Sequence, residues 1–168
     1  MVLILKHRSF DDFAGMSPQD TAALLAQART LQSAARSGTP QSALRGKNLG
    51  LLCATAGDAE AALFKRAASA LGAHVAFLRP SLSEQSAPQE VQHTARVLGR
   101  LYVAVCCVGM TAGLVRRIAA DAGVPVFEGI ASPLHPTAPL AESLDPGTAP
   151  DDNRCLVIQA VLLSALAD

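Results

Sequence analysis

Residues 55–78 have the sequence TAGDAEAALFKRAASALGAHVAFL, which predicts a turn, an amphipathic helix and a strand in succession. The apolar run before it, Asn48 to Ala54, has the length and composition of a strand buried in a parallel sheet. In α/β proteins, phosphates often bind at such a turn, because the N–H groups and the positive dipole end of the helix face the ligand. Here Gly57 lies in the turn and the helix opens with Asp58 and Glu60. Two acids therefore occupy the phosphate position.

The same alternation of strands and helices continues on both sides of this stretch. Ser17, Pro18 and Asp20 supply an N-cap, a first-turn proline and an acid, so they predict a helix start. The apolar face of this helix comprises Leu24, Leu25, Ala28 and Leu31. The predicted elements that follow are a strand over His74–Leu78, a helix over Pro88–Arg100, a strand over Val103–Val108, a helix over Thr111–Ala122 that ends at Gly123, and a short strand over Pro125–Phe127.

Strands joined by helix-length crossovers form a parallel sheet that is covered on both faces. We therefore predict an α/β fold with a single doubly wound parallel sheet of about four strands and helices on both faces. In the helix over Pro88–Arg100, four apolar residues are expected to face inward: Val91, Ala95, Leu98 and Leu101.

The domain organisation follows from length and composition. A chain of 168 residues fits one core. Residues 1–145 form the predicted sheet domain, and the Pro- and Asp-rich residues 146–152 are typical of a linker. Residues 153–168 predict an apolar C-terminal helix that packs back on the same domain.

Composition excludes several classes of partner. The 14 basic residues balance the 14 acidic ones and Trp is absent, so neither a basic stripe nor a stacking platform for nucleic acid is expected. The start MVLILKHRSF lacks the layout of a signal peptide. The longest apolar segment, Cys155 to Ala167, is too short to span a bilayer. We expect a cytoplasmic protein with no membrane partner.

Metal ions and cofactors are not expected either. The four cysteines contain no CxxC pair and have no histidine at ligand spacing, so they are interpreted as buried thiols. Cys106 and Cys107 should point to opposite faces of one strand. The turn at Gly57 has one glycine where a dinucleotide fingerprint needs three.

Several segments, in this order, resemble the carbamoyl phosphate-binding half of the aspartate/ornithine carbamoyltransferases, and the ornithine enzymes most of all. They are Leu5-Lys6-His7, Ser17-Pro18, Leu44-Arg45-Gly46-Lys47-Asn48-Leu49, Leu71-Gly72-Ala73-His74, His93-Thr94-Ala95-Arg96-Val97-Leu98-Gly99-Arg100, Val124-Pro125-Val126 and Leu134-His135-Pro136. Asp152-Asn153-Arg154 and the helix after it resemble the family's terminal helix, which returns to the first domain. The resemblance implies that the amino-acid-binding domain is missing between Leu144 and Pro150.

The resemblance fails where the family binds phosphate. Its Ser-Thr-Arg-Thr-Arg loop falls on residues 57–61, so Ala59 and Ala61 stand where the family has arginines. Its Arg-Thr pair falls on Val108-Gly109, and its His-Pro-x-Gln signature keeps His135 but has Ala138 in place of Gln. Losing two arginine contacts would remove roughly 3–6 kcal/mol, or about two to four orders of magnitude in affinity. The predicted vestigial or rebuilt pocket comprises Gly57, Asp58, Ala59, Glu60, Val108, His135 and Ala138, with no catalytic residue and no metal.

Two functions remain open from the sequence. The first is a degenerate, catalytically inactive homologue that acts as an oligomeric binding or regulatory subunit, either as a trimer or with a full-length carbamoyltransferase. The alternative is an enzyme or small-molecule binder in amino-acid metabolism whose pocket is rebuilt around Asp58, Glu60 and His135, for a cation or an amine. Each residue also has a structural interpretation: Asp58 as an N-cap, Glu60 as a solvated first-turn residue, and His135 as a residue that stabilises a proline-bounded turn.

Overall fold

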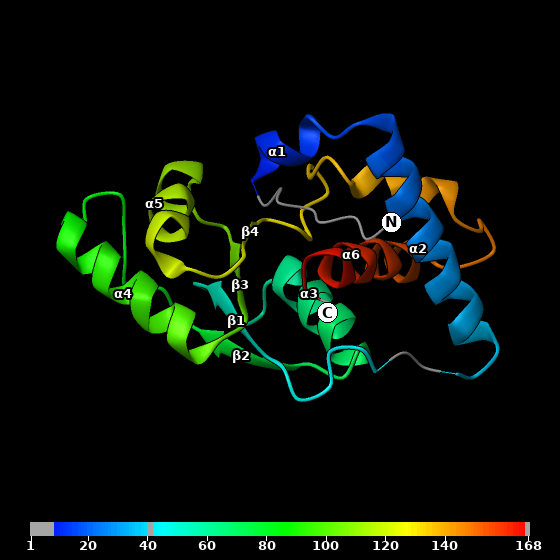
Figure 1. Cartoon of the computed structure of the whole chain (residues 1–168), viewed down its shortest axis with the longest axis horizontal. Helices are drawn as coiled ribbons and strands as arrows, with labels where there is room; N and C mark the ends of the chain where they lie inside the picture. Colours follow the sequence, from blue (N-terminus) through cyan, green and yellow to red (C-terminus); the bar gives the residue numbers. More distant parts are fainter. Residues whose placement is uncertain (1–8, 40–41, 167–168) are drawn as a thin grey trace.

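A computed structural model describes residues 9–39 and 42–166 of the chain. Its centre is a sheet of four parallel strands in the order β2-β1-β3-β4 (Figure 1). The strands are β1 (Asn48–Cys53), β2 (His74–Leu78), β3 (Ala104–Val108) and β4 (Val126–Glu128). The predicted α/β fold, with four parallel strands at nearly the predicted positions, is therefore confirmed.

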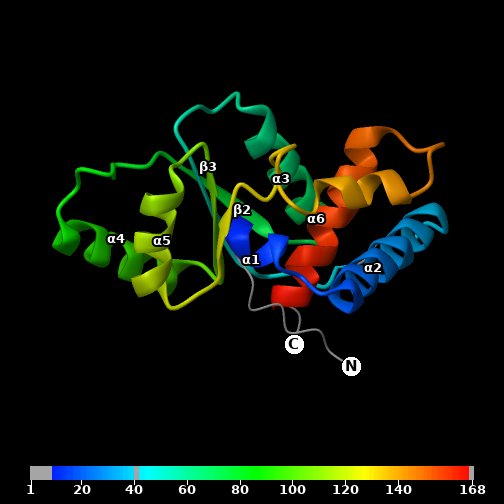
Figure 2. The same cartoon turned by 90° about the horizontal axis from the view of Figure 1, so that it is seen from above.

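Helices cover both faces of this sheet (Figures 1 and 2). One face packs against α3 (Ala59–Ala70), α6 (Pro150–Leu166) and, beyond α6, α2 (Pro18–Arg36). The other face packs against α4 (Pro88–Leu101) and α5 (Ala112–Ala122). Cys106 belongs to the first core and Cys107 to the second, so the predicted opposite orientation of the two thiols is confirmed.

Capping residues fix the helix starts that the sequence predicts. The Ser17 side chain accepts a hydrogen bond from the Asp20 N–H at 3.1 Å, and Thr111 caps α5 in the same way. At its other end α5 stops at Gly123, whose φ of 72° is the left-handed conformation that glycine adopts without strain. A short helix, α1 (Phe10–Ala14), is not predicted from the sequence; it is held by a capping box between Ser9 and Asp12.

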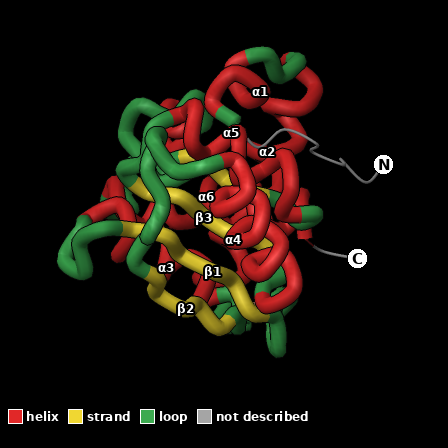
Figure 3. The backbone as a smooth tube through the Cα atoms, turned by 90° about the vertical axis from the view of Figure 1, so that its left-hand side faces the viewer, coloured by secondary structure: helices red, strands yellow, loops and turns green. Residues whose placement is uncertain are grey.

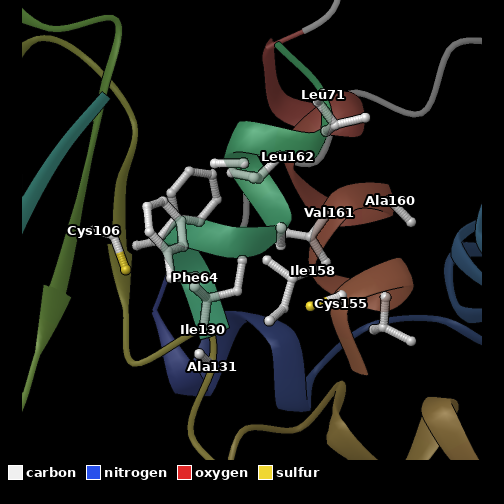
Figure 4. Close-up of a cluster of buried hydrophobic side chains, with 14 of the residues drawn as sticks. Phe64, Leu71, Cys106, Ile130, Ala131, Cys155, Ile158, Ala160, Val161 and Leu162 are labelled. Carbon is white, nitrogen blue, oxygen red and sulfur yellow. The ribbon is translucent and has the colours of Figure 1, made fainter. Parts of the chain in front are cut away.

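The C-terminal helix α6 packs back on the sheet domain, as predicted, and is buried along almost its whole length. In Figure 4, its residues Ile158, Val161 and Leu162 lie against Phe64 of α3. The helix begins at Pro150, three residues before the predicted start, so residues 150–152 are helical and do not belong to the linker. Proline suits the first turn of a helix because its missing N–H has no partner there.

Leu101 corrects the predicted inner face of α4. Val91, Ala95 and Leu98 are buried, but Leu101 is 59% exposed. The reason lies in the next residue. A Cβ atom on Gly50 would lie 3.0 Å from the ring of Tyr102, so Tyr102 covers the sheet in place of Leu101.

Two further predictions concern a matching segment near the N-terminus and the absence of a membrane span. The matching segment Leu5-Lys6-His7 lies outside the described residues. Within residues 9–39 and 42–166, no helix combines the length and hydropathy needed to span a membrane.

Candidate functional site

The turn after β1 lies at the topological switch point of the sheet, where the order in which the chain adds strands reverses. From β1 the chain passes to β2 on one side, and β3 lies on the other side, with Cys53 paired to Val108 at their ends. Figure 3 shows β3, β1 and β2 in this arrangement. Ligands of open α/β sheets bind at such a switch point, outside the carboxyl ends of the strands. Gly57, Asp58 and Val108 are therefore gathered at the expected edge.

Asp58 is the N-cap of α3. Its Oδ1 atom accepts hydrogen bonds from the backbone N–H groups of Glu60 at 2.8 Å and Ala61 at 3.0 Å. Its own N–H donates to the Thr55 carbonyl oxygen at 3.2 Å. The Asp58 carboxylate thus already accepts hydrogen bonds from the backbone amides that would donate to a bound phosphate at this helix start.

The neighbours of Asp58 divide between solvent and core. Ala59 is exposed and Glu60 is partly exposed, whereas Ala61 is buried. Partial burial, together with the nearby Asp58 carboxylate, raises the pKa of Glu60. Ala61 is buried in the same core cluster as Phe64, so the position that matches the family's last loop arginine faces the core and not an open site.

His135 is buried, with 1% of its surface exposed. Its Nδ1 atom accepts a hydrogen bond from the Thr137 backbone N–H at 3.2 Å and lies 2.8 Å from the Thr137 hydroxyl oxygen. Because a backbone N–H can only donate, Nδ1 carries no proton and the neutral ring is protonated at Nε2. The ring also meets Phe13 edge to face at 4.7 Å. Burial and the Arg154 charge lower the pKa of His135 to about 3.

These contacts favour the structural interpretation of His135. The ring connects α1 to the turn at residues 132–138, in which the His135 N–H donates to Ser132 and the Ala138 N–H donates to His135. A neutral, enclosed imidazole of this kind holds its turn in place.

A cavity of about 500 Å³ lies beside the switch point, between the start of α3, the segment 131–142 and the start of α6. Its walls include Ala59, Glu60 and Ala138 from the predicted pocket. Gly57, Asp58, Val108 and His135 do not line it. The structure thus gathers three of the seven predicted residues around one space; that these seven residues bind a ligand stays a prediction.

Arg154 also lines this cavity and was not predicted as a site residue. Its side chain is 7% exposed, and its Nη2 donates to the Ile130 carbonyl oxygen, but Nε and Nη1 have no hydrogen-bond partner. Burial lowers its pKa to about 10. Each unmet donor costs roughly 1–3 kcal/mol, so this guanidinium is poorly compensated. In the sequence, an arginine in the first turns of an apolar helix was the available signal.

Metal ligation has no support at this site. Within the described parts of the chain, no three His, Cys, Asp or Glu side chains are close enough together to hold a metal ion. All four cysteines are buried thiols, and burial raises the pKa of Cys107 to about 12.

Comparison with solved structures finds the same fold. Ornithine carbamoyltransferase from Pyrococcus furiosus matches with a TM-score of 0.70 at 23% identity, covering 85% of this chain and 45% of that one. Ornithine carbamoyltransferase from Burkholderia thailandensis matches with a TM-score of 0.67 at 20% identity, covering 82% and 47%.

Sequence comparison agrees with the structural matches. Ornithine carbamoyltransferase from Cutibacterium acnes is 38% identical over 144 residues, and that from Actinobacillus pleuropneumoniae is 35% identical over 144 residues. Each match covers 86% of this chain and 43% of the relative, so the chain spans less than half the length of these proteins. The family model for the aspartate/ornithine carbamoyltransferase carbamoyl-P binding domain matches residues 8–145. The chain therefore belongs to the aspartate/ornithine carbamoyltransferase family.

Proposed function

We propose that this protein is a non-catalytic carbamoyltransferase homologue that keeps the scaffold of the carbamoyl phosphate-binding domain and acts as an oligomeric binding or regulatory subunit. The observation that carries the proposal is the Asp58 carboxylate, which accepts from the Glu60 and Ala61 amides at 2.8 and 3.0 Å. A phosphate that entered this turn would have to displace it.

Energies favour the carboxylate over a phosphate at this position. Hydrogen bonds to a charged group contribute about 1.5–3 kcal/mol each, so replacing two of them gives the phosphate little net gain. The helix dipole adds only about 0.3–1 kcal/mol. Glu60 adds a second negative charge in the same turn, and the exposed Ala59 supplies no cation. We infer that carbamoyl phosphate binds weakly or not at all.

The binding calorimetry of carbamoyl phosphate tests this inference. The expected result is no saturable heat at millimolar ligand with the unaltered chain. Submillimolar binding would contradict the proposal. The informative control is Ala59→Arg combined with Glu60→Thr, which restores one guanidinium and removes one carboxylate at positions that are not buried; its affinity should exceed that of the unaltered chain by about tenfold or more.

Association through α4 is the second part of the proposal. Three large apolar side chains on or just after this helix are exposed, namely Val97, Leu101 and Val103. Val97 and Leu101 also border a groove of about 240 Å³ between α4 and the segment that follows β2. Clustered apolar surface of this kind is typical of protein contacts. Another copy of this chain, or a full-length carbamoyltransferase, is the partner we propose.

Light scattering tests the association. Leu101→Glu should lower the measured mass to that of a monomer, because it places a charge in the apolar contact. Leu134→Glu is the matched control, since Leu134 is 84% exposed but lies in the turn at residues 132–138. A monomer in the unaltered chain, with no binding to a full-length carbamoyltransferase, would remove the subunit role.

A second candidate function is a rebuilt small-molecule site. The observation that favours it is the cavity of about 500 Å³ with Glu60 in its wall. Its volume lies in the range of small-ligand pockets. Ligand binding that is lost in Glu60→Gln would support this candidate, and binding that is unaffected by changes to the lining residues would count against it.

A further inference from the structure

A second cavity, of about 330 Å³, lies where α2, α3 and α6 meet. Helix α6 lies between α2 and α3 and packs against both (Figures 1 and 2). The cavity has no lining residue in common with the one beside the switch point, so it is a separate space. It adjoins an apolar cavity of about 300 Å³, with which it shares Ala35, Ala70, Leu156 and Gln159.

Two buried glutamines line the larger of these two cavities. Gln32 of α2 and Gln159 of α6 are each 8% exposed. The Nε2 group of Gln159 donates to the Ala67 carbonyl oxygen at 3.2 Å. The Nε2 group of Gln32 donates to Asn153 Oδ1 at 3.3 Å, and Asn153 Nδ2 in turn donates to the Asp145 carbonyl oxygen at 2.9 Å. Because backbone carbonyl oxygens can only accept, these bonds fix which end of each amide is the nitrogen.

The amide oxygens of both glutamines are left without a donor. Across residues 9–39 and 42–166, no hydrogen bond is donated to Oε1 of Gln32 or of Gln159. In that part of the chain, the fully buried side-chain atoms that lack a partner belong to His135 and Arg154, so the two glutamine oxygens keep access to solvent. A buried amide ordinarily uses its oxygen as well as its N–H groups. One cavity therefore has two open acceptors in its wall.

Thr148 adds a donor to the same wall. Its hydroxyl oxygen accepts from Gln32 Nε2 at 3.4 Å, so its hydroxyl hydrogen is available to another acceptor. A head group that both donates and accepts hydrogen bonds would complement this arrangement.

The charges at the cavity are already paired. Arg36 forms an ion pair with Asp145, and Arg66 forms one with Asp152. A charged ligand would lose its hydration here without gaining an unpaired partner of opposite sign from these four side chains. The wall thus favours an uncharged head group, such as a hydroxyl or a primary amide.

We propose that the cavity between α2, α3 and α6 binds an uncharged amphipathic molecule, whose O–H or N–H head lies at Gln32 and Gln159 and whose short apolar chain lies in the adjoining cavity. The head donates to the glutamine oxygens and accepts from the Thr148 hydroxyl. The chain packs against Leu31 and Leu71, which line the apolar cavity. Each volume is that of a small-ligand site. This site is independent of the proposed loss of phosphate binding.

The side-chain amide signals of Gln32 and Gln159 in ¹H–¹⁵N NMR test the proposal directly. The probes are hexanamide and 1-hexanol, and the matched charged probes are hexanoate and hexylamine, which keep a similar chain. The expected result is a saturable shift of both glutamine signals with hexanamide or 1-hexanol. That probe should bind about tenfold or more tightly than either charged probe.

Variants locate the head and the chain of the ligand. Gln159→Met keeps the side-chain length but removes the acceptor, so it should weaken the bound probe about tenfold. Ala70→Leu adds bulk at an exposed position that lines both cavities, so it should abolish binding. Ala62→Leu, at an exposed position of the same helix that lines neither cavity, is the matched control and should change nothing. Circular dichroism checks that each variant is folded.

Three outcomes would overturn the proposal. One is binding of hexanoate or hexylamine that equals that of the uncharged probes, which would show that an uncharged head is not selected. Another is no saturable shift at up to tens of millimolar probe, which would leave the cavity without a ligand of this class. The third is unchanged affinity in Ala70→Leu, which would place the bound probe elsewhere on the protein.

Discussion

Replacing Asp58 gives the sharpest test of the phosphate turn. In Asp58→Ala the amides of Glu60 and Ala61 lose the carboxylate oxygen that lies 2.8 and 3.0 Å away. Two charge-assisted bonds in a dry site would contribute roughly 3–6 kcal/mol. However, Asp58 is only partly buried and Gly57 and Ala59 are exposed, so water replaces the lost acceptor. The relevant figure is that of a helix cap, about 1 kcal/mol.

Thermal unfolding measures this loss. For a domain of this size, 1 kcal/mol corresponds to a drop in Tm of about 2–4 °C. Asp58→Ser keeps an oxygen acceptor at the cap but removes the charge, so it should lose less than half as much. Added phosphate should raise the Tm of Asp58→Ala more than that of the unaltered chain, because only the variant has free amides at the helix start.

The reasoning would be refuted by either of two results. One is an unchanged Tm in Asp58→Ala, which would mean that the cap bonds contribute nothing. The other is an equal response to phosphate in both proteins, which would mean that Asp58 does not compete with an anion.

Three further predictions concern pH and packing. The raised pKa of Glu60 means that the folded state binds its proton more tightly than the unfolded state, so this group destabilises the fold as pH rises above about 4.5. Glu60→Gln should therefore unfold at higher denaturant than the unaltered chain at pH 7, and the difference should vanish near pH 4; a difference independent of pH would contradict this. The pKa of His135 is lowered to about 3, which makes stability fall as pH falls: below about pH 6.5 the unfolded state takes up a proton that the folded state does not. This group should lower the free energy of unfolding by up to about 1.4 kcal/mol per pH unit between pH 6 and 3.5. Urea titrations of His135→Gln should show a pH dependence of unfolding that is smaller by this amount. Gly99→Ala should destabilise by about 1–3 kcal/mol or more, since its Cβ would lie 1.7 Å from the Ala122 carbonyl oxygen and force α4 from α5; an Ala substitution at the exposed Arg96 of the same helix is the control.

The sheet and its crossovers were predictable because local signals agree with the packing. Ser17 and Thr111 are cap residues, Gly123 is a stop signal, and the apolar runs at β1 and β3 are long enough for buried strands. The prediction that Leu101 faces inward was wrong, because the helical period cannot show that Tyr102 leaves the helix and places its ring over Gly50.

The candidate site was harder to predict, because its walls come from distant segments. The sequence places Glu60 and Ala138 in one pocket through the resemblance, but Asp151 and Arg154 reach the same cavity only when α6 folds back along α3. The one sequence signal for Arg154 is its place in the first turns of an apolar helix. Its burial depends on the segment at Ile130, which no local pattern encodes.

The most direct measurement follows the backbone amides of Glu60 and Ala61 by ¹H–¹⁵N NMR while carbamoyl phosphate is added. Because Asp58 already accepts from both amides, their signals should stay in place up to millimolar ligand. A saturable shift of these two signals at submillimolar ligand would show an oxyanion at the helix start and contradict the proposed loss of phosphate binding.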